Sequence, residues 1–170
     1  QILDRELLDG LDKFWRARLW AELEHLPRER QAKVLPYIYQ WAEGGASVSG
    51  ADAVRGYNRT FDMRRRAAEQ FHEIDFLLSP TNQVAAFPAE WASPTNDPAL
   101  PFEHIGFTVP WNMSEQPALS INCGFTSAGM PIGLQIVGPR FADIEVLRLG
   151  KTYEHWRGPI SRWPQPPGAN

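Results

Sequence analysis

The first part of the chain has the spacing of apolar residues that is typical of an amphipathic helix. Apolar side chains recur at every fourth position, at Leu3, Leu7, Leu11, Trp15 and Leu19. Residues four apart share one face of a helix, so the pattern predicts a helix over residues 2–26 that ends before Pro27. A chain that opens inside a helix, on Gln1 rather than on methionine, is expected to be part of a longer protein.

Two further helices are predicted next. Residues 28–42 form a shorter helical segment, in which Pro36 predicts a kink or break because proline lacks a backbone N–H. Residues 50–73 form the third helix, and its expected apolar face comprises Val54, Tyr57, Phe61, Ala68 and Phe71. The run Arg64-Arg65-Arg66 is interpreted as a solvated face or local ion pairs rather than as an anion site.

The middle of the chain changes from helical spacing to a short apolar run and a long loop. Residues 76–79 are read as a buried strand that Pro80 closes. Residues 82–106 contain four prolines and show no apolar period. Long loops in compact domains are usually functional or disordered, so this segment is predicted to cross the surface over a substrate entrance.

Two strands are predicted after the loop. Residues 118–122 and 132–137 are joined by a turn that ends at Gly129, and a link this short predicts antiparallel pairing. Gly133 leaves room for another backbone to come close.

A last helix is predicted over residues 143–157, with Asp143 as its N-cap. Its expected apolar face comprises Val146, Leu149, Tyr153 and Trp156. An irregular tail follows over residues 158–170.

Net charge, cysteine count and the length of apolar runs exclude several classes of binding partner and site. The chain has 17 basic and 20 acidic residues and a net charge of −3, so neither nucleic acid nor an anionic membrane is an expected partner. Cys123 is the only cysteine, which excludes an internal disulfide and a cysteine-rich zinc site and fits a reducing, cytoplasmic location. We expect it to be buried and inert. No apolar run approaches the ~20 residues of a membrane span.

One glycine- and serine-rich segment has the composition of a nucleophile loop. It runs from Gly44 to Gly50, but Ser49 and Asp52 are read as a helix-capping box. A serine nucleophile also needs an adjacent base, and none of the three lysines lies in a glycine or serine setting. The four histidines lack metal-ligand spacing. We therefore predict no catalytic residue, no metal site and no cofactor site in this chain.

Four motifs lie in order in the second half of the chain. They are Ser79-Pro80-Thr81, then Pro110-Trp111-Asn112-Met113-Ser114-Glu115-Gln116-Pro117-Ala118, then Ser120-Ile121-Asn122-Cys123-Gly124-Phe125, and Gly129-Met130-Pro131-Ile132-Gly133-Leu134-Gln135-Ile136-Val137-Gly138. In this order and spacing they resemble the C-terminal core of the amidase signature family over residues 75–150. Glu115 stands where that family usually has glycine, and Asn122 where it usually has proline.

The resemblance implies an α/β chain that is the C-terminal part of an α/β/α fold, with a mixed sheet flanked by helices. Residues 1–170 would be part of one amidase domain: a helical segment 1–73, the sheet core 75–157 and the tail 158–170. The family hydrolyses amide C–N bonds with a serine, a second serine and a lysine that have no counterparts in this sequence. We therefore expect the chain alone to be inactive.

The resemblance also implies candidates for the wall of a substrate pocket, namely Thr81, Trp111 and Asn112. The implied partners are the missing N-terminal part of the same enzyme and a small-molecule amide, with a homodimer contact as a further expectation. Two alternatives stay open: the amidase subunit of a glutamine-dependent tRNA amidotransferase, and a non-catalytic interaction module on the same scaffold.

Overall fold

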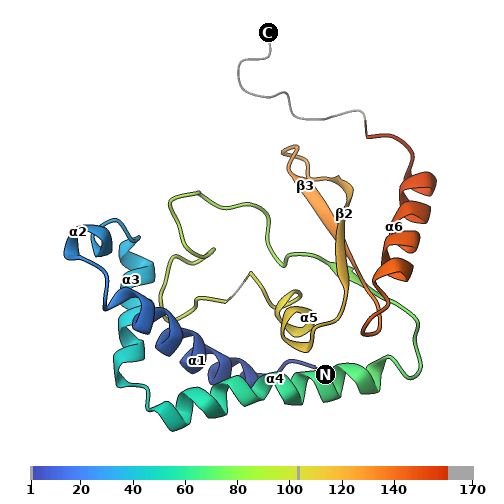
Figure 1. The fold of residues 1–170 in the computed structure, drawn as a ribbon. Helices are drawn as coiled ribbons and strands as arrows, with labels where there is room; N and C mark the ends of the chain where they lie inside the picture. Colours follow the sequence, from blue (N-terminus) through green and yellow to red (C-terminus); the bar gives the residue numbers. More distant parts are fainter. Residues whose placement is uncertain (1, 103, 161–170) are drawn as a thin grey trace.

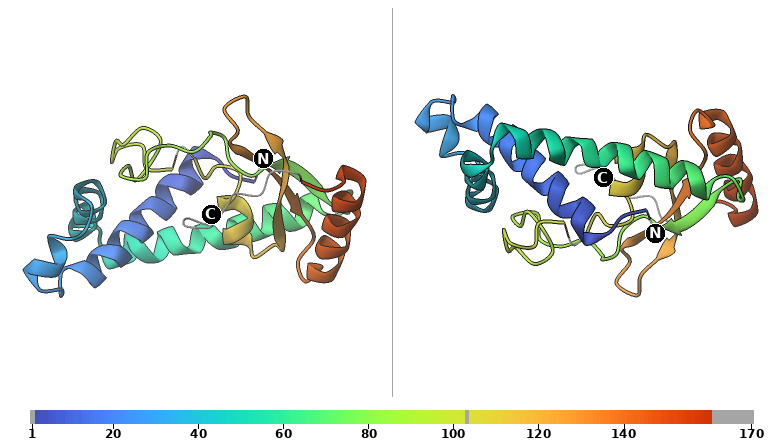
Figure 2. Two further views of the ribbon diagram at one scale, coloured as in Figure 1. Left: turned by 90° about the horizontal axis from the view of Figure 1, so that it is seen from above. Right: turned by 90° about the horizontal axis from the view of Figure 1, so that it is seen from below.

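The structure is a computed structural model that describes residues 2–102 and 104–160. Its two longest helices, α1 (Arg5–Leu23) and α4 (Gly50–Gln70), pack side by side along one flank (Figure 1 and Figure 2). At their crossing, a Cβ atom on Gly56 would lie 2.2 Å from the carbonyl oxygen of Gly10. The two backbones can approach this closely only because Gly56 has no side chain.

The face of α4 that packs against its neighbours differs from the predicted one. The buried residues are mostly small: Gly56, Thr60, Met63 and Ala67. Val54, Tyr57 and Phe61, which were expected on the core face, are 60%, 45% and 50% exposed. The prediction of that face was therefore wrong, because close helix packing selected small side chains over large apolar ones.

The helix starts follow from capping groups. The Asp4 carboxylate accepts a hydrogen bond from the backbone N–H of Leu7 at 2.9 Å, so α1 begins at Arg5 rather than at residue 2. The Ser49 hydroxyl accepts from the N–H of Asp52 at 3.1 Å and contacts the Asp52 carboxylate at 2.6 Å. Ser49 is thus a helix cap, as predicted.

The predicted helix 28–42 is broken, as Pro36 indicated. It divides into α2 (Arg28–Gln31) and α3 (Pro36–Glu43), and the 3-10 turn η1 (Gly44–Ser47) links α3 to α4. Pro36 is the first residue of α3, the position at which a missing N–H costs nothing because it has no partner in the helix.

Three strands form one sheet: β1 (Leu77–Pro80), β2 (Ala118–Phe125) and β3 (Pro131–Val137). The order is β1-β3-β2, and both pairs are antiparallel. This confirms the pairing predicted for the last two strands. The three strands contain no parallel pair, so the parallel part of the expected mixed sheet is not found among residues 2–102 and 104–160.

Helices cover both faces of the sheet, which confirms the predicted α/β class. On one face, Val137 of β3 packs with Ala67 of α4 and with Trp111 of the short helix α5 (Val109–Ser114). On the other face, α6 (Asp143–Arg157) brings Gly150 against the side chain of Leu119 in β2. The helix α5 was not predicted.

Two expectations about single residues were wrong. Ala142, not Asp143, is the N-cap of α6 and makes no side-chain capping bond. Asp143 instead lies in the first turn, where its charge favours the helix dipole. Cys123 is exposed rather than buried. It lies at a bulge of β2 between Asn122 and Gly124, where the strand pairing with β3 is irregular.

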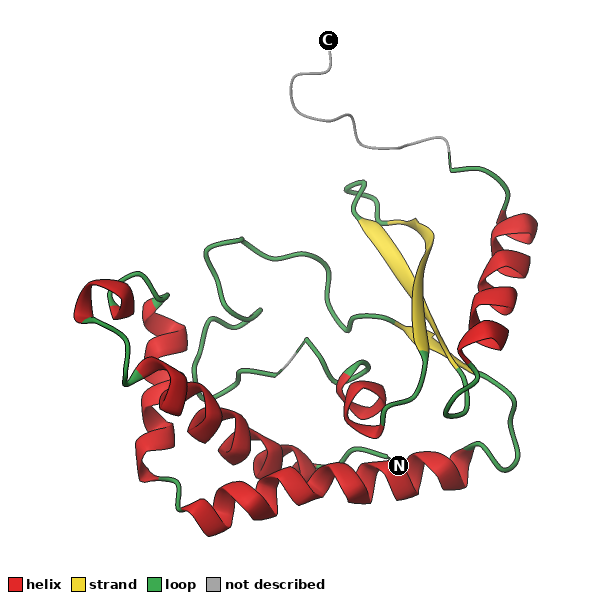
Figure 3. Cartoon of the chain, viewed as in Figure 1, coloured by secondary structure: helices red, strands yellow, loops and turns green. Residues whose placement is uncertain are grey.

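The long loop between β1 and α5 runs outside the sheet (Figure 3). Residue 103 of this loop and residues 161–170 of the tail lie outside the described residues. Buried Ser93 anchors the loop to α3, because the Tyr37 hydroxyl lies 3.1 Å from the Ser93 hydroxyl and donates to the Asp97 carbonyl at 2.9 Å. No described helix is long and apolar enough to cross a membrane.

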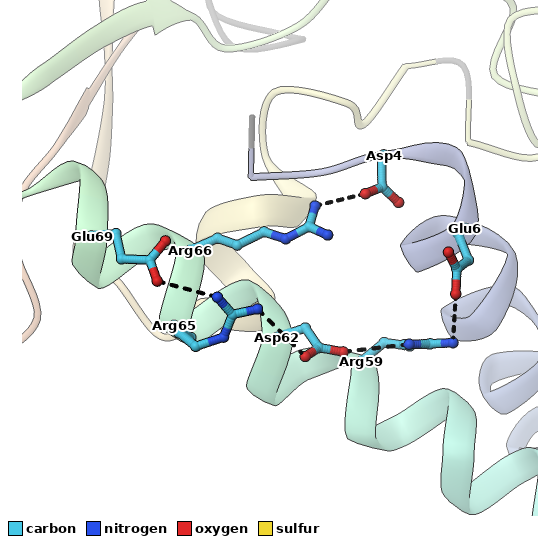
Figure 4. A network of polar contacts seen from close by, with 7 residues as sticks. All are labelled: Asp4, Glu6, Arg59, Asp62, Arg65, Arg66 and Glu69. Atoms are coloured by element: carbon cyan, nitrogen blue, oxygen red, sulfur yellow. Dashed lines mark hydrogen bonds and ion pairs between the residues drawn. The ribbon is translucent and has the colours of Figure 1, made fainter.

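The three-arginine run on α4 forms ion pairs, as predicted. Arg65 pairs with Glu69 at 3.1 Å within the helix, whereas Arg66 reaches Asp4 at 2.6 Å and so ties α4 to the start of α1 (Figure 4). Arg59 makes a similar link to Glu6 at 2.9 Å. These contacts fix the register of the two long helices.

Candidate functional site

A cavity of about 570 Å³ lies at the end of the sheet where β1 leads into the long loop. Each strand contributes to its floor: Thr81 directly follows β1, Ser120 lies in β2 and Gly133 in β3. The hydroxyls of Thr81 and Ser120 are 2.8 Å apart and hydrogen-bond to each other. Thr81, a predicted pocket residue, thus lines this cavity.

Gly133 makes this floor possible. A Cβ atom on Gly133 would lie 2.6 Å from the Thr81 hydroxyl oxygen and 3.0 Å from that of Ser120. The space that a Gly133 side chain would occupy is therefore filled by the Thr81 and Ser120 side chains, whereas the prediction was that another backbone would come close there. The N–H of Thr81 also donates to the Gly133 carbonyl at 2.9 Å, which extends the strand pairing into the cavity.

The long loop supplies further lining residues of the cavity, among them Phe87 and His104. The rings of His104 and Phe87 meet edge to face with centroids 5.6 Å apart. Burial lowers the pKa of His104, so the imidazole is neutral at neutral pH. Its Nδ1 atom is buried and has no hydrogen-bond partner among the described residues.

Asn122 closes one side of the cavity and explains a departure from the family pattern. Its amide accepts from the N–H of Gly124 at 3.2 Å and donates to the Gly124 carbonyl at 3.0 Å. These bonds hold a bulge in β2 between the two residues. Proline has no amide side chain, so Asn122 gives the bulge a support that the usual residue lacks.

The predicted pocket residues are not brought together. Trp111 is 5% exposed and lines a second cavity of about 370 Å³, beside Phe107 and Leu77. Asn112 lies on the exposed side of α5, away from both cavities.

The buried amide of Gln135 donates to the Ser79 hydroxyl at 3.0 Å and to the Phe107 carbonyl at 2.8 Å, and so connects the sheet to the segment before α5.

Glu115 occupies the position where glycine is usual, and the backbone shows why. Its φ of 61° lies in the left-handed region, which favours glycine. The Glu115 carboxylate contacts the guanidinium groups of Arg64 on α4 and Arg140 after β3. These two ion pairs join α4 to the end of the sheet.

The first cavity has the chemistry of a binding site. Among the described residues, the Thr81 and Ser120 hydroxyls hydrogen-bond to each other. A serine nucleophile would instead need a neighbouring base. No group of three or more potential metal ligands occurs among residues 2–102 and 104–160. Sequence reasoning missed Ser120, Asn122 and Gly133 as cavity residues, although the two-residue spacing of Ser120 and Asn122 already placed them on one face of a strand.

Comparisons with known proteins give a consistent picture. A family model described as Amidase matches residues 11–147. The A subunit of glutamyl-tRNA(Gln) amidotransferase from Myxococcus xanthus is 39% identical over 92 residues, which make up 54% of this chain and 18% of that protein.

Solved structures match over more of the chain. A crystal structure of an amidase has a TM-score of 0.73 at 20% identity, covering 91% of this chain and 36% of that one. The structure of 6-aminohexanoate cyclic dimer hydrolase has a TM-score of 0.72 at 23% identity, covering 96% and 37%. At these identities the likeness shows the fold. The chain spans about a third of these structures and a smaller share of the curated relative.

Proposed function

Because this chain belongs to the amidase signature family, we propose that it is the C-terminal segment of an enzyme that hydrolyses linear amide C–N bonds. In this proposal the chain supplies strands of the sheet core and one wall of the substrate pocket. The wall is the cavity above Thr81, Ser120 and Gly133.

One observation carries the fragment part of the proposal: large apolar side chains lie uncovered on the sheet and on the helix that packs against it. Leu78 in the edge strand β1 is 59% exposed, and Trp156 on α6 is 75% exposed. Phe141, just before α6, is 83% exposed. Extensive exposed apolar surface marks an interaction site, and we assign the cover of these three side chains to the N-terminal part of the same enzyme.

The chemistry in this proposal comes from that other part. A serine attacks the amide carbonyl and forms an acyl-enzyme, the amine leaves, and water then releases the acid. The floor of the cavity positions the substrate, and no cofactor is needed. The lone Cys123 supports a reducing, cytoplasmic setting for the enzyme.

A second candidate function is the amidase subunit of a glutamine-dependent tRNA amidotransferase. The observation that favours it is the similarity to the Myxococcus protein over about half of the chain. In that case the enzyme would copurify with further subunits and release ammonia from glutamine.

Two measurements test the leading proposal. The intact mass of the protein from its natural source should exceed the 19.3 kDa of this chain. The longer protein should hydrolyse simple amides, whereas the 170-residue chain should not. Turnover by the 170-residue chain that is lost on Ser120→Ala would contradict the proposal. A natural protein of 19.3 kDa without amidase activity would instead favour a non-catalytic module.

A further inference from the structure

The first cavity, here called the main cavity, is lined by no residue with a formal charge among the residues that the structure describes. Sixteen residues line it, and none is Asp, Glu, Lys or Arg, although these types make up 22% of the chain. The apolar part of the lining comes from the loop after β1 and from the turn before β3: Val84, Ala85, Ala86, Phe87, Met130, Pro131 and Ile132.

The polar groups of the cavity are neutral as well. The Thr81 and Ser120 hydroxyls satisfy each other, and the Asn122 amide is engaged by the backbone of Gly124. His104 has an edge-to-face contact with Phe87, and its burial favours the uncharged imidazole. A ligand therefore meets neutral hydrogen-bonding groups here, but no counter-ion.

A nearby site shows the opposite character. Glu115, Arg64 and Arg140 form a charged cluster beside a separate cavity of about 280 Å³, lined by Arg64 and Arg140. None of the three lines the main cavity. The charged cluster and the described lining of the main cavity are thus separate sites. Arg157 contacts the lining residue Asn122 through its carbonyl, but it does not itself line the cavity.

Resting on the proposed function, we propose that the cavity holds an uncharged, largely apolar group of the amide substrate and selects against substrates that place an ammonium or carboxylate group there. A charge removed from water is costly unless it is paired, and the lining residues that the structure describes include no charged partner. If this inference holds, glutamine is a poor substrate for this cavity, because its α-ammonium and α-carboxylate groups would both lie against an uncharged lining.

The test uses a series of amides that differ only in the group at the far end of the chain. Hexanamide is neutral, 6-aminohexanamide carries an ammonium group, and adipamic acid carries a carboxylate. With the protein in the length that its natural source makes, we expect kcat/KM for hexanamide to exceed that for either charged amide by about tenfold or more. Equal or better turnover of a charged amide overturns the inference.

A charge placed in the cavity wall should change this preference in a defined direction. Ile132 lines the cavity and is 41% exposed, so Ile132→Lys is expected to fold. The variant should raise the ratio of kcat/KM for adipamic acid to that for 6-aminohexanamide by about tenfold. The matched control Leu35→Lys, at a residue 43% exposed and remote from the cavity lining, should leave the ratio unchanged. An unchanged ratio in Ile132→Lys overturns the inference.

A binding experiment separates failure of this inference from failure of the proposed function. If no amide is hydrolysed, the proposed function is wrong, and methyl NMR of Met130 and Ile132 then decides the inference alone. Shifts on addition of hexanamide, without shifts from the two charged amides, support it. Shifts from a charged amide, or none from hexanamide, overturn it.

Discussion

Arg157, the last residue of α6, donates a hydrogen bond of 2.6 Å to the backbone carbonyl of Asn122. Asn122 holds the bulge of β2 and lines the main cavity. The bond thus links the last described helix to a residue that lines the main cavity, through an arginine side chain that is only 20% exposed.

Arg157→Ala should lower the free energy of unfolding by about 1–2 kcal/mol, because a part-buried carbonyl loses a charged donor. The control is Arg148→Ala on the same helix, whose side chain is 76% exposed and 3.8 Å from Glu145. That change should cost less than about 0.5 kcal/mol. Urea unfolding of both variants measures the difference, and equal losses would show that the Asn122 bond contributes nothing.

Two substitutions at Glu115 separate its backbone conformation from its ion pairs. Both Glu115→Gly and Glu115→Ala remove the contacts with Arg64 and Arg140. Only alanine keeps the cost of a side chain at a φ of 61°. We expect the alanine variant to be less stable than the glycine variant by about 1 kcal/mol in urea unfolding. An alanine variant as stable as the glycine variant would contradict the left-handed conformation.

The Asp4 cap predicts a dependence of stability on pH. The hydrogen bond from the Leu7 N–H, and then that from Arg66, hold the pKa of Asp4 below its ordinary value. A carboxylate with a lowered pKa in the folded state stabilises the fold at pH values above the unfolded pKa, and this contribution is lost as the pH falls through the folded pKa.

Asp4→Asn tests this sign, since asparagine is also a good N-cap but does not titrate. Between neutral pH and about pH 3, the thermal midpoint of the wild-type chain should fall further than that of the variant. If the two midpoints fall in parallel, Asp4 is not the group responsible.

Gly133→Ala should destabilise the fold by about 1–3 kcal/mol, because the new methyl group overlaps the Thr81 and Ser120 hydroxyls. The cost should be smaller in a Thr81→Ala background, which removes the nearer oxygen. Gly50→Ala is the control, since a Cβ atom there meets nothing within 4 Å. A double-mutant cycle in urea gives the coupling, and strict additivity would exclude the contact over Gly133.

Helix positions and strand pairing followed from the sequence where a local signal was strong. The fourfold repeat of α1, the break at Pro36, the Ser49 cap and the antiparallel strands around Gly129 were all predicted from nearby residues. The amidase resemblance added the layer order, which no local pattern contains. The division into segments 1–73, 75–157 and 158–170 stays a prediction.

The failures have physical causes. The helix α5 has six residues, too few to show a period, and it contains Pro110. The core face of α4 was missed because hydrophobicity ranks Phe61 above Gly56, whereas a close crossing with α1 requires the smaller residue. The cavity combines residues from three strands and a loop. Thr81 and Ser120 come from opposite sides of β3, and their hydroxyls meet over Gly133, a contact that no local sequence pattern contains.

The strand order β1-β3-β2 also bears on how the chain folds as it is synthesised. In the described sheet, β1 and β2 do not pair with each other, and each pairs with β3. Of the three strands, β3 is the last to be synthesised. Until residues 131–137 emerge, Leu77–Pro80 lacks the strand with which it pairs in the described structure, while α1 and α4 can already pack. The helical flank should therefore form first, and the ligand-binding end of the sheet should close in a late, long-range step.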